Sequence, residues 1–389
     1  MFVFYGQKDR KKEQVERLAL FRRNKSLSGF IALNIVILPF SCYNDIIGGG
    51  LIMNLNISQI REITTGAVRI EEIDNAFHFY RFTKQQEDLY KNRNLSFYKK
   101  TLSTSGVQIR FRTNSQNLFL SAEVSNASTR SYFSFEVFVN GKKIDDIKNF
   151  SESELSGNYT GFEFPLGIFS KKFDLGTSEK EVCIYFPWSV NATIKKLIID
   201  DDSFVTAVKP SKKLLVFGDS VTQGYDALYP SNKYITQIAN MLDAEEYNKA
   251  IGGEIYFPEL AKEREAFEPN YIIVSYGSND WNRSTKEDLA RNCNEIFNNL
   301  NNNYPNAKIF VITPIWRKDM NEIRPFGDFL CVGEIIQKQA AKFANISVIH
   351  GFEFVPKNED LFADLRLHPN DKGFEYYFKS LSKQINDIL

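Results

Sequence analysis

The chain has 389 residues, which is enough for two domains of ordinary size. It carries 48 basic and 48 acidic side chains, and this balance argues against a partner such as nucleic acid or an anionic membrane. The four cysteines are scattered, with no CxxC pair and no Cys/His cluster, so neither a zinc site nor a disulfide framework is indicated. We therefore expect a protein that needs no metal and no cofactor.

Residues 1–53 are predicted to be an extension outside the folded domains. A basic stretch precedes the apolar run Phe30–Phe40, as in a secretory signal. The run is too short to span a bilayer as a typical helix, so no membrane span is expected. Alternatively, translation begins at Met53, and the three glycines at 48–50 reflect a translated ribosome-binding site. A secretory signal would imply a secreted protein, and a start at Met53 would imply a cytoplasmic one. We expect a cytoplasmic protein.

Residues 54–208 alternate apolar and polar side chains, the pattern of half-buried strands. Such strands are expected at Val107–Thr113, Leu118–Val124, Tyr132–Val139, Val182–Phe186 and Thr193–Ile199. Asn140-Gly141, at the end of the third, is a strong signal for a tight hairpin. No segment of useful length shows helical periodicity, so the region is predicted to be an all-β sandwich of jelly-roll type.

The pattern changes near Lys209-Pro210, and from there short apolar strands alternate with amphipathic helices. The strands are expected at Leu214–Phe217, Glu246–Ile251, Tyr271–Tyr276, Ile309–Thr313 and Ser347–Ile349. The clearest helix is predicted to open with a capping box of Ser284 and Glu287. Its buried stripe comprises Leu289, Cys293, Ile296, Phe297 and Leu300. The alternation predicts a parallel sheet covered by helices on both faces over residues 210–389.

Four polar blocks lie at strand ends or loops of this sheet. Gly-Asp-Ser220 follows the first strand, Gly252-Gly253 the second and Gly-Ser-Asn279-Asp the third, and His368 precedes the last helix. Catalytic groups of parallel sheets collect at the carboxyl ends of the strands. A serine becomes a nucleophile when a neighbouring base takes its proton, and histidine suits that role near neutral pH.

The blocks resemble those of the SGNH (GDSL-type) hydrolases, in which Ser, Gly, Asn and His come from four separate segments. The resemblance covers residues 210–389 and implies a flavodoxin-like, three-layer α/β/α hydrolase domain. Residues 54–208 resemble, more generally, the amino-terminal sandwich of two-domain carbohydrate esterases in this superfamily. By this resemblance Ser220 is the nucleophile, His368 the general base, and the oxyanion hole consists of the N–H groups of Ser220 and Gly253 with the Asn279 amide.

The third member of the triad departs from the family pattern. The family usually places an aspartate three residues before the histidine, but position 365 is leucine and Asp364 lies four before His368. Either a bulge brings Asp364 to the imidazole, or a main-chain carbonyl orients His368 and the site is a dyad. We predict the first, with a carboxylate oxygen within about 3.5 Å of a ring nitrogen.

The implied activity is hydrolysis of small acyl esters, acetyl above all, on a small-molecule or oligosaccharide substrate. The alternatives are a lysophospholipase- or thioesterase-type lipid hydrolase and a non-hydrolytic acyltransferase or binding relative. Trp281, Trp316 and Arg317 follow the third and fourth strands and are predicted to bind substrate. His78 and His350 are expected to be structural, and the sequence indicates no oligomeric state.

Overall fold

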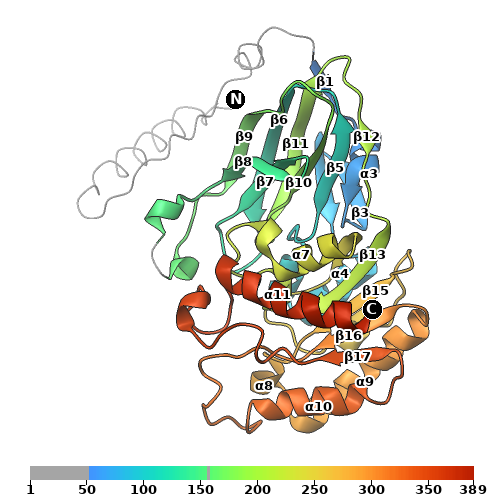
Figure 1. Ribbon diagram of the computed structural model, residues 1–389, viewed down its shortest axis with the longest axis vertical. Coiled ribbons are helices and arrows are strands. Elements are labelled where there is room, and N and C mark those ends of the chain that lie inside the picture. Colours follow the sequence, from blue (N-terminus) through green and yellow to red (C-terminus); the bar gives the residue numbers. More distant parts are fainter. Residues whose placement is uncertain (1–51, 156–157) are drawn as a thin grey trace, which may run out of the picture. The chain divides into compact units, whose positions relative to one another are not determined.

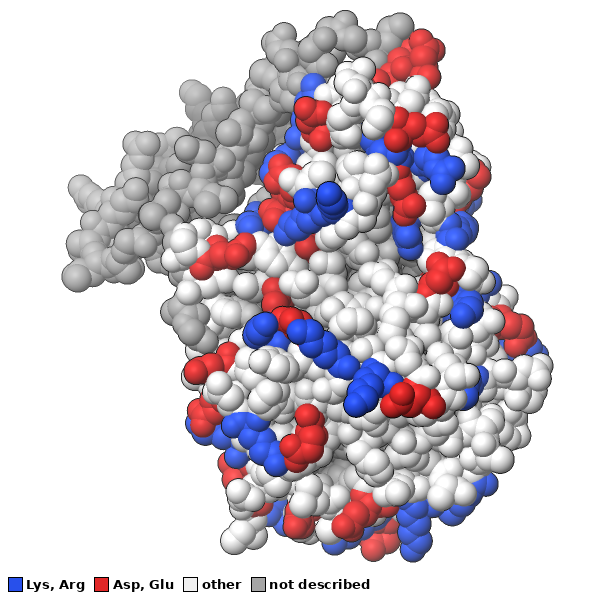
Figure 2. Space-filling model, in the orientation of Figure 1, with Lys and Arg blue, Asp and Glu red and all other residues white. Residues whose placement is uncertain are grey.

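The computed structural model describes residues 52–155 and 158–389 (Figure 1). The predictions for residues 1–51 lie outside this range, whereas Ile52 and Met53 belong to strand β1. Residues Gly50–Leu389 form one compact unit, and the domain boundaries predicted within it remain predictions. Within the described ranges, no helix has the length and hydrophobicity needed to cross a bilayer. Basic and acidic side chains are interspersed on the face shown in Figure 2.

The first part of the described chain forms two antiparallel sheets of six strands each. The first sheet consists of β1 (Ile52–Asn54), β3 (Arg69–Ile73), β4 (Ala76–Tyr80), β6 (Asn117–Asn126), β9 (Gly167–Asp174) and β11 (Val190–Asp200). The second consists of β2 (Thr64–Thr65), β5 (Gln108–Thr113), β7 (Ser134–Val139), β8 (Lys142–Lys148), β10 (Lys180–Tyr185) and β12 (Thr206–Ala207). Leu120 and Leu197 of the first sheet share one core with Val137 and Ile184 of the second. The predicted β-sandwich is therefore confirmed.

The β7–β8 turn confirms the predicted hairpin. Asn140 and Gly141 have φ angles of 49° and 76°, and two consecutive positive φ angles are what a two-residue type I′ turn requires. Asparagine and glycine are the residues that adopt this conformation at the least cost.

The prediction that residues 54–208 contain no substantial helix is wrong. The described residues of this region form three α-helices: α3 (Ile57–Ile63), α4 (Lys84–Arg93) and α5 (Leu95–Thr101). Helix α4 is polar and buries only Gln86, Glu87 and Tyr90, so it carries no apolar stripe to detect. It is held by a capping box between Thr83 and Gln86 instead. Caps and tertiary contacts, rather than amphipathicity, define these helices.

The second part contains a five-stranded parallel sheet in the order β14-β13-β15-β16-β17. Its strands are β13 (Lys212–Gly218), β14 (Ala244–Asn248), β15 (Tyr271–Ser275), β16 (Lys308–Ile312) and β17 (Ile346–Ile349). Numbered along the chain, the order is 2-1-3-4-5, that of flavodoxin-like folds, as predicted. The strand order reverses between β13 and β15, and ligands bind outside the carboxyl ends of strands at such a point.

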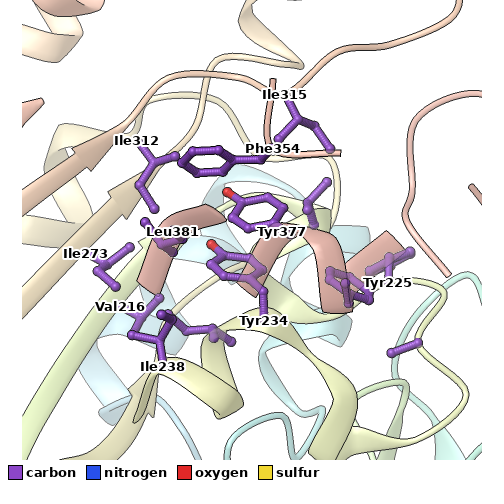
Figure 3. Close-up of a cluster of buried hydrophobic side chains, with 14 of the residues drawn as sticks. Val216, Tyr225, Tyr234, Ile238, Ile273, Ile312, Ile315, Phe354, Tyr377 and Leu381 are labelled. Carbon is purple, nitrogen blue, oxygen red and sulfur yellow. The ribbon is translucent and has the colours of Figure 1, made fainter. Parts of the chain in front are cut away.

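Helices cover both faces of this sheet. Leu214 and Val216 of β13 lie in one core cluster with α7 (Tyr234–Met241) and α11 (Asp371–Ile388). Figure 3 shows Val216, Ile273 and Ile312 of the sheet together with Tyr234 of α7 and Tyr377 of α11. The alternate residues Leu215 and Phe217 lie in a second cluster with α9 (Lys286–Asn303) and α10 (Leu330–Ala340). This alternation is expected when both faces of a strand are buried.

Helix α9 buries the five predicted stripe residues, but its predicted cap is wrong by one position. The N-cap is Thr285, whose hydroxyl accepts a hydrogen bond from Asp288 N at 3.0 Å. Ser284 instead ends the short helix α8 (Asp280–Arg283), and its hydroxyl bonds to Asp280. Both residues are good capping types, so composition alone did not separate them.

Arg81, directly after β4, links the antiparallel part to the loop that follows β14. It is 1% exposed and donates hydrogen bonds to the carbonyl oxygens of Asn248 and Ala250, at 2.5 and 3.2 Å. It also bonds to the carbonyl oxygens of Lys100 and Ser103. A buried guanidinium with this many acceptors holds the loop containing Gly252 and Gly253 against α5.

Candidate active site

Ser220 is the first residue of helix α6 (Ser220–Gln223), directly after β13. Asp219 caps this helix, with Oδ1 accepting from Val221 N at 3.1 Å, and burial raises the pKa of Asp219 to about 6. A Cβ atom at Gly218 would lie 2.6 Å from Thr222 and 2.8 Å from Ser275 O. Only glycine fits this turn, which brings the serine to the carboxyl end of β13.

His368 connects Ser220 to Asp364. Its Nε2 lies 2.8 Å from Ser220 Oγ, and its Nδ1 lies 2.7 Å from Asp364 Oδ2. The distance between His368 Nδ1 and Asp364 Oδ2 is below the 3.5 Å that was predicted for Asp364. A serine, an imidazole and a carboxylate in this order form the constellation that generates a nucleophilic alkoxide in serine hydrolases.

The loop before His368 explains how an acid four residues away reaches the ring. Leu365 adopts a left-handed conformation with φ of 54°. Asp364 Oδ1 accepts hydrogen bonds from the backbone N of Arg366, Leu367 and His368, at 3.0, 2.8 and 3.0 Å. Burial alone would raise the pKa of Asp364, but the bonds from His368 and these amides hold that pKa well below its usual range. The carboxylate is therefore ionised at neutral pH.

A second carboxylate, Asp226, lies beside the same ring nitrogen and was missed by the sequence analysis. Its Oδ2 is 3.5 Å from His368 Nδ1, and its side chain is fully buried. Arg130 pairs with both carboxylate oxygens, at 2.7 and 3.1 Å, and the Tyr132 hydroxyl donates to Oδ1 at 2.5 Å. Arg130 lies 96 residues before Asp226, so no local pattern could have connected them.

The donor atoms of Asp226, Asp364 and His368 lie within 4.8 Å of one another, a spacing that a metal ion could use. Their other partners argue against that use. The Arg130 guanidinium already binds both oxygens of Asp226 with a positive charge, and His368 Nε2 faces Ser220. The cluster therefore suits two carboxylates beside a catalytic imidazole better than a bound metal ion.

The three residues predicted to form the oxyanion hole, Ser220, Gly253 and Asn279, line one pocket. Gly253 has φ of 86°, which favours glycine. Within residues 52–155 and 158–389, no group accepts a hydrogen bond from the backbone N of Ser220 or of Gly253. Asn279 Nδ2 donates one hydrogen bond to Glu254 O at 3.0 Å, and its second N–H remains available as a donor. The pocket can therefore offer three N–H groups to a developing negative charge.

The pocket has a volume of about 500 Å³ and is strongly basic. Six cationic residues line it: Lys100, Arg130, Arg283, Arg317, Arg324 and Arg366. The ring of Tyr225 packs against His368, with 5.6 Å between the ring centroids. Two of these residues, Lys100 and Arg130, come from the antiparallel part of the chain.

Of the three residues predicted to bind substrate, the structure places only Arg317 in the pocket lining. Its Nη1 donates to Ser278 O at 2.9 Å, so it also supports the Asn279 loop. Trp281 is 1% exposed, packs against Phe329 and donates its ring N–H to Gly327 O. Trp316 packs on Phe362, with 5.3 Å between centroids. Both tryptophans lie outside the lining, because Trp281 is part of the hydrophobic core and the partly buried Trp316 packs against it.

Comparisons with known proteins point to a family for residues 216–376 and to similar folds. Residues 216–376 match the sequence model of the GDSL-like lipase/acylhydrolase family. No curated protein matches the chain. Among solved structures, the chain is similar to the salicylyl-acyltransferase SsfX3 from a tetracycline biosynthetic pathway, with 16% identity and a TM-score of 0.69, over 84% of this chain and 94% of that one.

Two further structures are similar along most of both chains. One is a putative GDSL-like lipase from Bacteroides ovatus, with 17% identity and a TM-score of 0.64, over 87% of this chain and 98% of that one. The other is a family two carbohydrate esterase from Cellvibrio japonicus, with 17% identity and a TM-score of 0.59, over 87% and 97%. At these identities the likeness shows the fold. The match over residues 216–376 spans all four blocks and confirms the resemblance drawn from them.

Proposed function

We propose that this protein is a serine esterase that hydrolyses esters of small acyl groups. The observation that carries the proposal is the chain of hydrogen bonds from Ser220 Oγ to His368 Nε2 and from His368 Nδ1 to Asp364, at 2.8 and 2.7 Å. In this arrangement His368 takes the hydroxyl proton as Ser220 Oγ attacks the ester carbonyl.

The remaining steps follow from the same groups. The N–H groups of Ser220, Gly253 and Asn279 stabilise the tetrahedral oxyanion. His368 then gives its proton to the leaving alcohol, which leaves the acyl group on Ser220. Water attacks this acyl-enzyme with His368 again as base, and the acid is released. Asp364 stabilises the imidazolium formed in each half-reaction.

We further propose that the acyl group is acetyl and the alcohol a carbohydrate. Support comes from similar structures described as a family two carbohydrate esterase and an acetyl xylan esterase, the latter from Butyrivibrio proteoclasticus. The polar, cationic lining also favours a hydrated substrate over a lipid tail. A lipid or thioester hydrolase would need an apolar trough at Ser220.

Acyl transfer is the second candidate, since one similar structure is described as a salicylyl-acyltransferase. A transferase would use the same acyl-enzyme and pass the acyl group to an alcohol instead of water. The two candidates differ in the product formed when an acceptor alcohol is present.

The test is a series of 4-nitrophenyl esters from acetate to octanoate, followed by acetylated oligosaccharides. We expect acetate to give the highest kcat/KM and Ser220→Ala to abolish hydrolysis without altering the circular dichroism spectrum. Ser211→Ala, at an exposed serine before β13, is the matched control and should keep full activity. More than a few per cent of activity in Ser220→Ala would contradict the nucleophile assignment. Acetylated cellobiose, formed from added cellobiose in place of free acetate, would favour transfer.

A further inference from the structure

Two cationic side chains of the pocket contact the loop that carries the proposed oxyanion donor Gly253. Lys100, in the last turn of α5, is 9% exposed, and its Nζ donates to Gly252 O at 2.6 Å. Arg283, the last residue of α8, donates from Nη1 to Gly253 O at 2.6 Å. Both side chains therefore hold backbone carbonyls beside the position where the ester carbonyl would bind.

These two cations differ from the other four in the pocket lining. Arg130 pairs with Asp226, and Arg317, Arg324 and Arg366 each have Asp319 within 4 Å. In the described part of the chain, no carboxylate lies within 4 Å of Lys100 Nζ or of the Arg283 guanidinium. Nearby Glu254 is fully buried and is paired with Arg93 at 2.7 Å. The wall beside Gly253 thus carries two charges without anionic partners.

Both groups have donors left for a ligand. An ammonium has three N–H donors and a guanidinium five, and one of each is used on the loop carbonyls. A Cβ atom at Gly253 would lie 3.7 Å from both terminal nitrogens of Arg283, so the guanidinium fork lies directly beside this residue. Such a fork matches the two oxygens of a carboxylate.

Burial and the charge of Arg283 lower the pKa of Lys100 to about 8, although the charge of Glu254 opposes this shift. A cation in this state gains from a bound anion, which would offset the repulsion between the two groups. A neutral ester leaves the repulsion in place.

We infer that the preferred substrate is an ester that carries a carboxylate, which Lys100 and Arg283 bind beside the oxyanion hole. This inference rests on the proposed esterase function and adds a substrate class to it. A carboxylate in the alcohol part, as in an acetylated acid, agrees with the acetyl group proposed above, whereas one in the acyl part, as in a hemisuccinate, would replace acetyl as the acyl group. Each requires the same pair of cations.

The test compares each acid with its own methyl ester. For the acyl part the pair is mono-4-nitrophenyl succinate and its methyl ester, and for the alcohol part 4-acetoxybenzoate and its methyl ester. We expect the acid of one pair to have a kcat/KM about tenfold above its methyl ester. Arg283→Gln should reduce that ratio about tenfold, and Arg283→Lys should restore part of it. Because Arg283 is exposed, this change is compatible with folding.

The matched control is Arg291→Gln on α9, an exposed arginine outside the pocket lining, which should keep the wild-type ratio. Binding to Ser220→Ala, measured by calorimetry, should show the same preference without turnover. Ratios that do not change in Arg283→Gln, with methyl esters still hydrolysed, would overturn the carboxylate inference and leave the esterase intact. Failure to hydrolyse any of the four esters, together with no reaction of Ser220 with a fluorophosphonate, would overturn both.

Discussion

The two parts of the described chain contribute different kinds of side chain to one pocket. The parallel-sheet part supplies the groups proposed to react, Ser220, His368 and Asp364. The antiparallel part supplies Lys100 and Arg130, which bind a loop carbonyl and a buried carboxylate. The first set lies at strand ends and loops of the sheet, whereas the second comes from α5 and from the segment between β6 and β7.

The two parts therefore have different roles at the site. The parallel sheet fixes the positions of the groups because its strands are buried and their carboxyl ends meet at one edge. The antiparallel part adds two of the six cations around them, through contacts between residues far apart in the sequence. Changes in the first set should therefore reduce catalysis by orders of magnitude, and changes in the second should alter pH dependence and specificity.

The largest effect short of removing the nucleophile or base is expected for Asp364→Asn. An amide cannot stabilise the imidazolium and favours the wrong tautomer, so kcat should fall about 10³- to 10⁴-fold. Steady-state kinetics on 4-nitrophenyl acetate measures this. Asp360→Asn, an exposed acid four residues earlier, is the control and should be close to wild type. If Asp364→Asn keeps most of its activity, His368 works without this acid.

Asn279→Ala should rank next. Its free amide N–H bonds mainly to the transition state, so kcat should fall by roughly 100- to 1,000-fold with little change in KM. The Gly253 and Ser220 amides would still act. A change confined to KM would instead assign Asn279 to substrate binding.

Asp280, fully buried next to Asn279, tests the cost of buried charge in the parallel-sheet part. Burial raises its pKa to about 7, against opposing hydrogen bonds from Ser284 and Tyr256. The folded state then binds more protons than the unfolded state between about pH 4 and 7, so this group makes stability fall as pH rises, by about 1 kcal/mol per pH unit. Asp219, with a pKa raised to about 6, contributes a change of stability with pH of the same sign.

Asp280→Asn should make the slope of unfolding free energy against pH, measured in urea, more positive by about that amount over this range. Asp288→Asn, at an acid of α9 that stays ionised in this range, should leave the slope unchanged. An identical slope in Asp280→Asn would contradict the raised pKa.

The smallest effect is expected for Arg130→Gln, in the antiparallel part. Removing the guanidinium leaves Asp226 with its hydrogen bond from Tyr132 but without its cationic partner, and a carboxylate near His368 Nδ1 whose charge is no longer balanced favours the protonated imidazole. We expect kcat/KM at pH 7 to fall about tenfold and the acidic limb of the pH–rate profile to move to higher pH. Arg130→Lys should rescue part of both changes. An equal loss at every pH would mean that Arg130 only supports the fold.

Much of the parallel-sheet part could be predicted from local sequence. Four of its five strands are short apolar runs, and the buried stripe of α9 has helical spacing, so these follow from periodicity. The exception is β14, which has the polar sequence Ala-Glu-Glu-Tyr-Asn and begins two residues before the strand predicted at Glu246–Ile251. The four polar blocks could be placed together because parallel strands end at one edge. Even the shifted Asp364 was a reasonable candidate, since it is the only acid among the residues just before His368.

The contacts between the parts could not be predicted in this way. Arg130 and Asp226 are 96 residues apart, and Arg81 reaches a carbonyl 167 residues away. Helix α5, which carries Lys100, has seven residues and no clear stripe. Such features depend on tertiary packing, which overrides local preference.

The most direct test of the account is the reaction of the protein with a fluorophosphonate at neutral pH, followed by peptide mass mapping. If His368 activates Ser220, the adduct should lie on Ser220 alone, and His368→Ala should slow its formation by at least about 1,000-fold. Ser220→Ala should give no adduct. Labelling of another serine, or labelling of Ser220 at an undiminished rate in His368→Ala, would contradict the proposed catalytic centre.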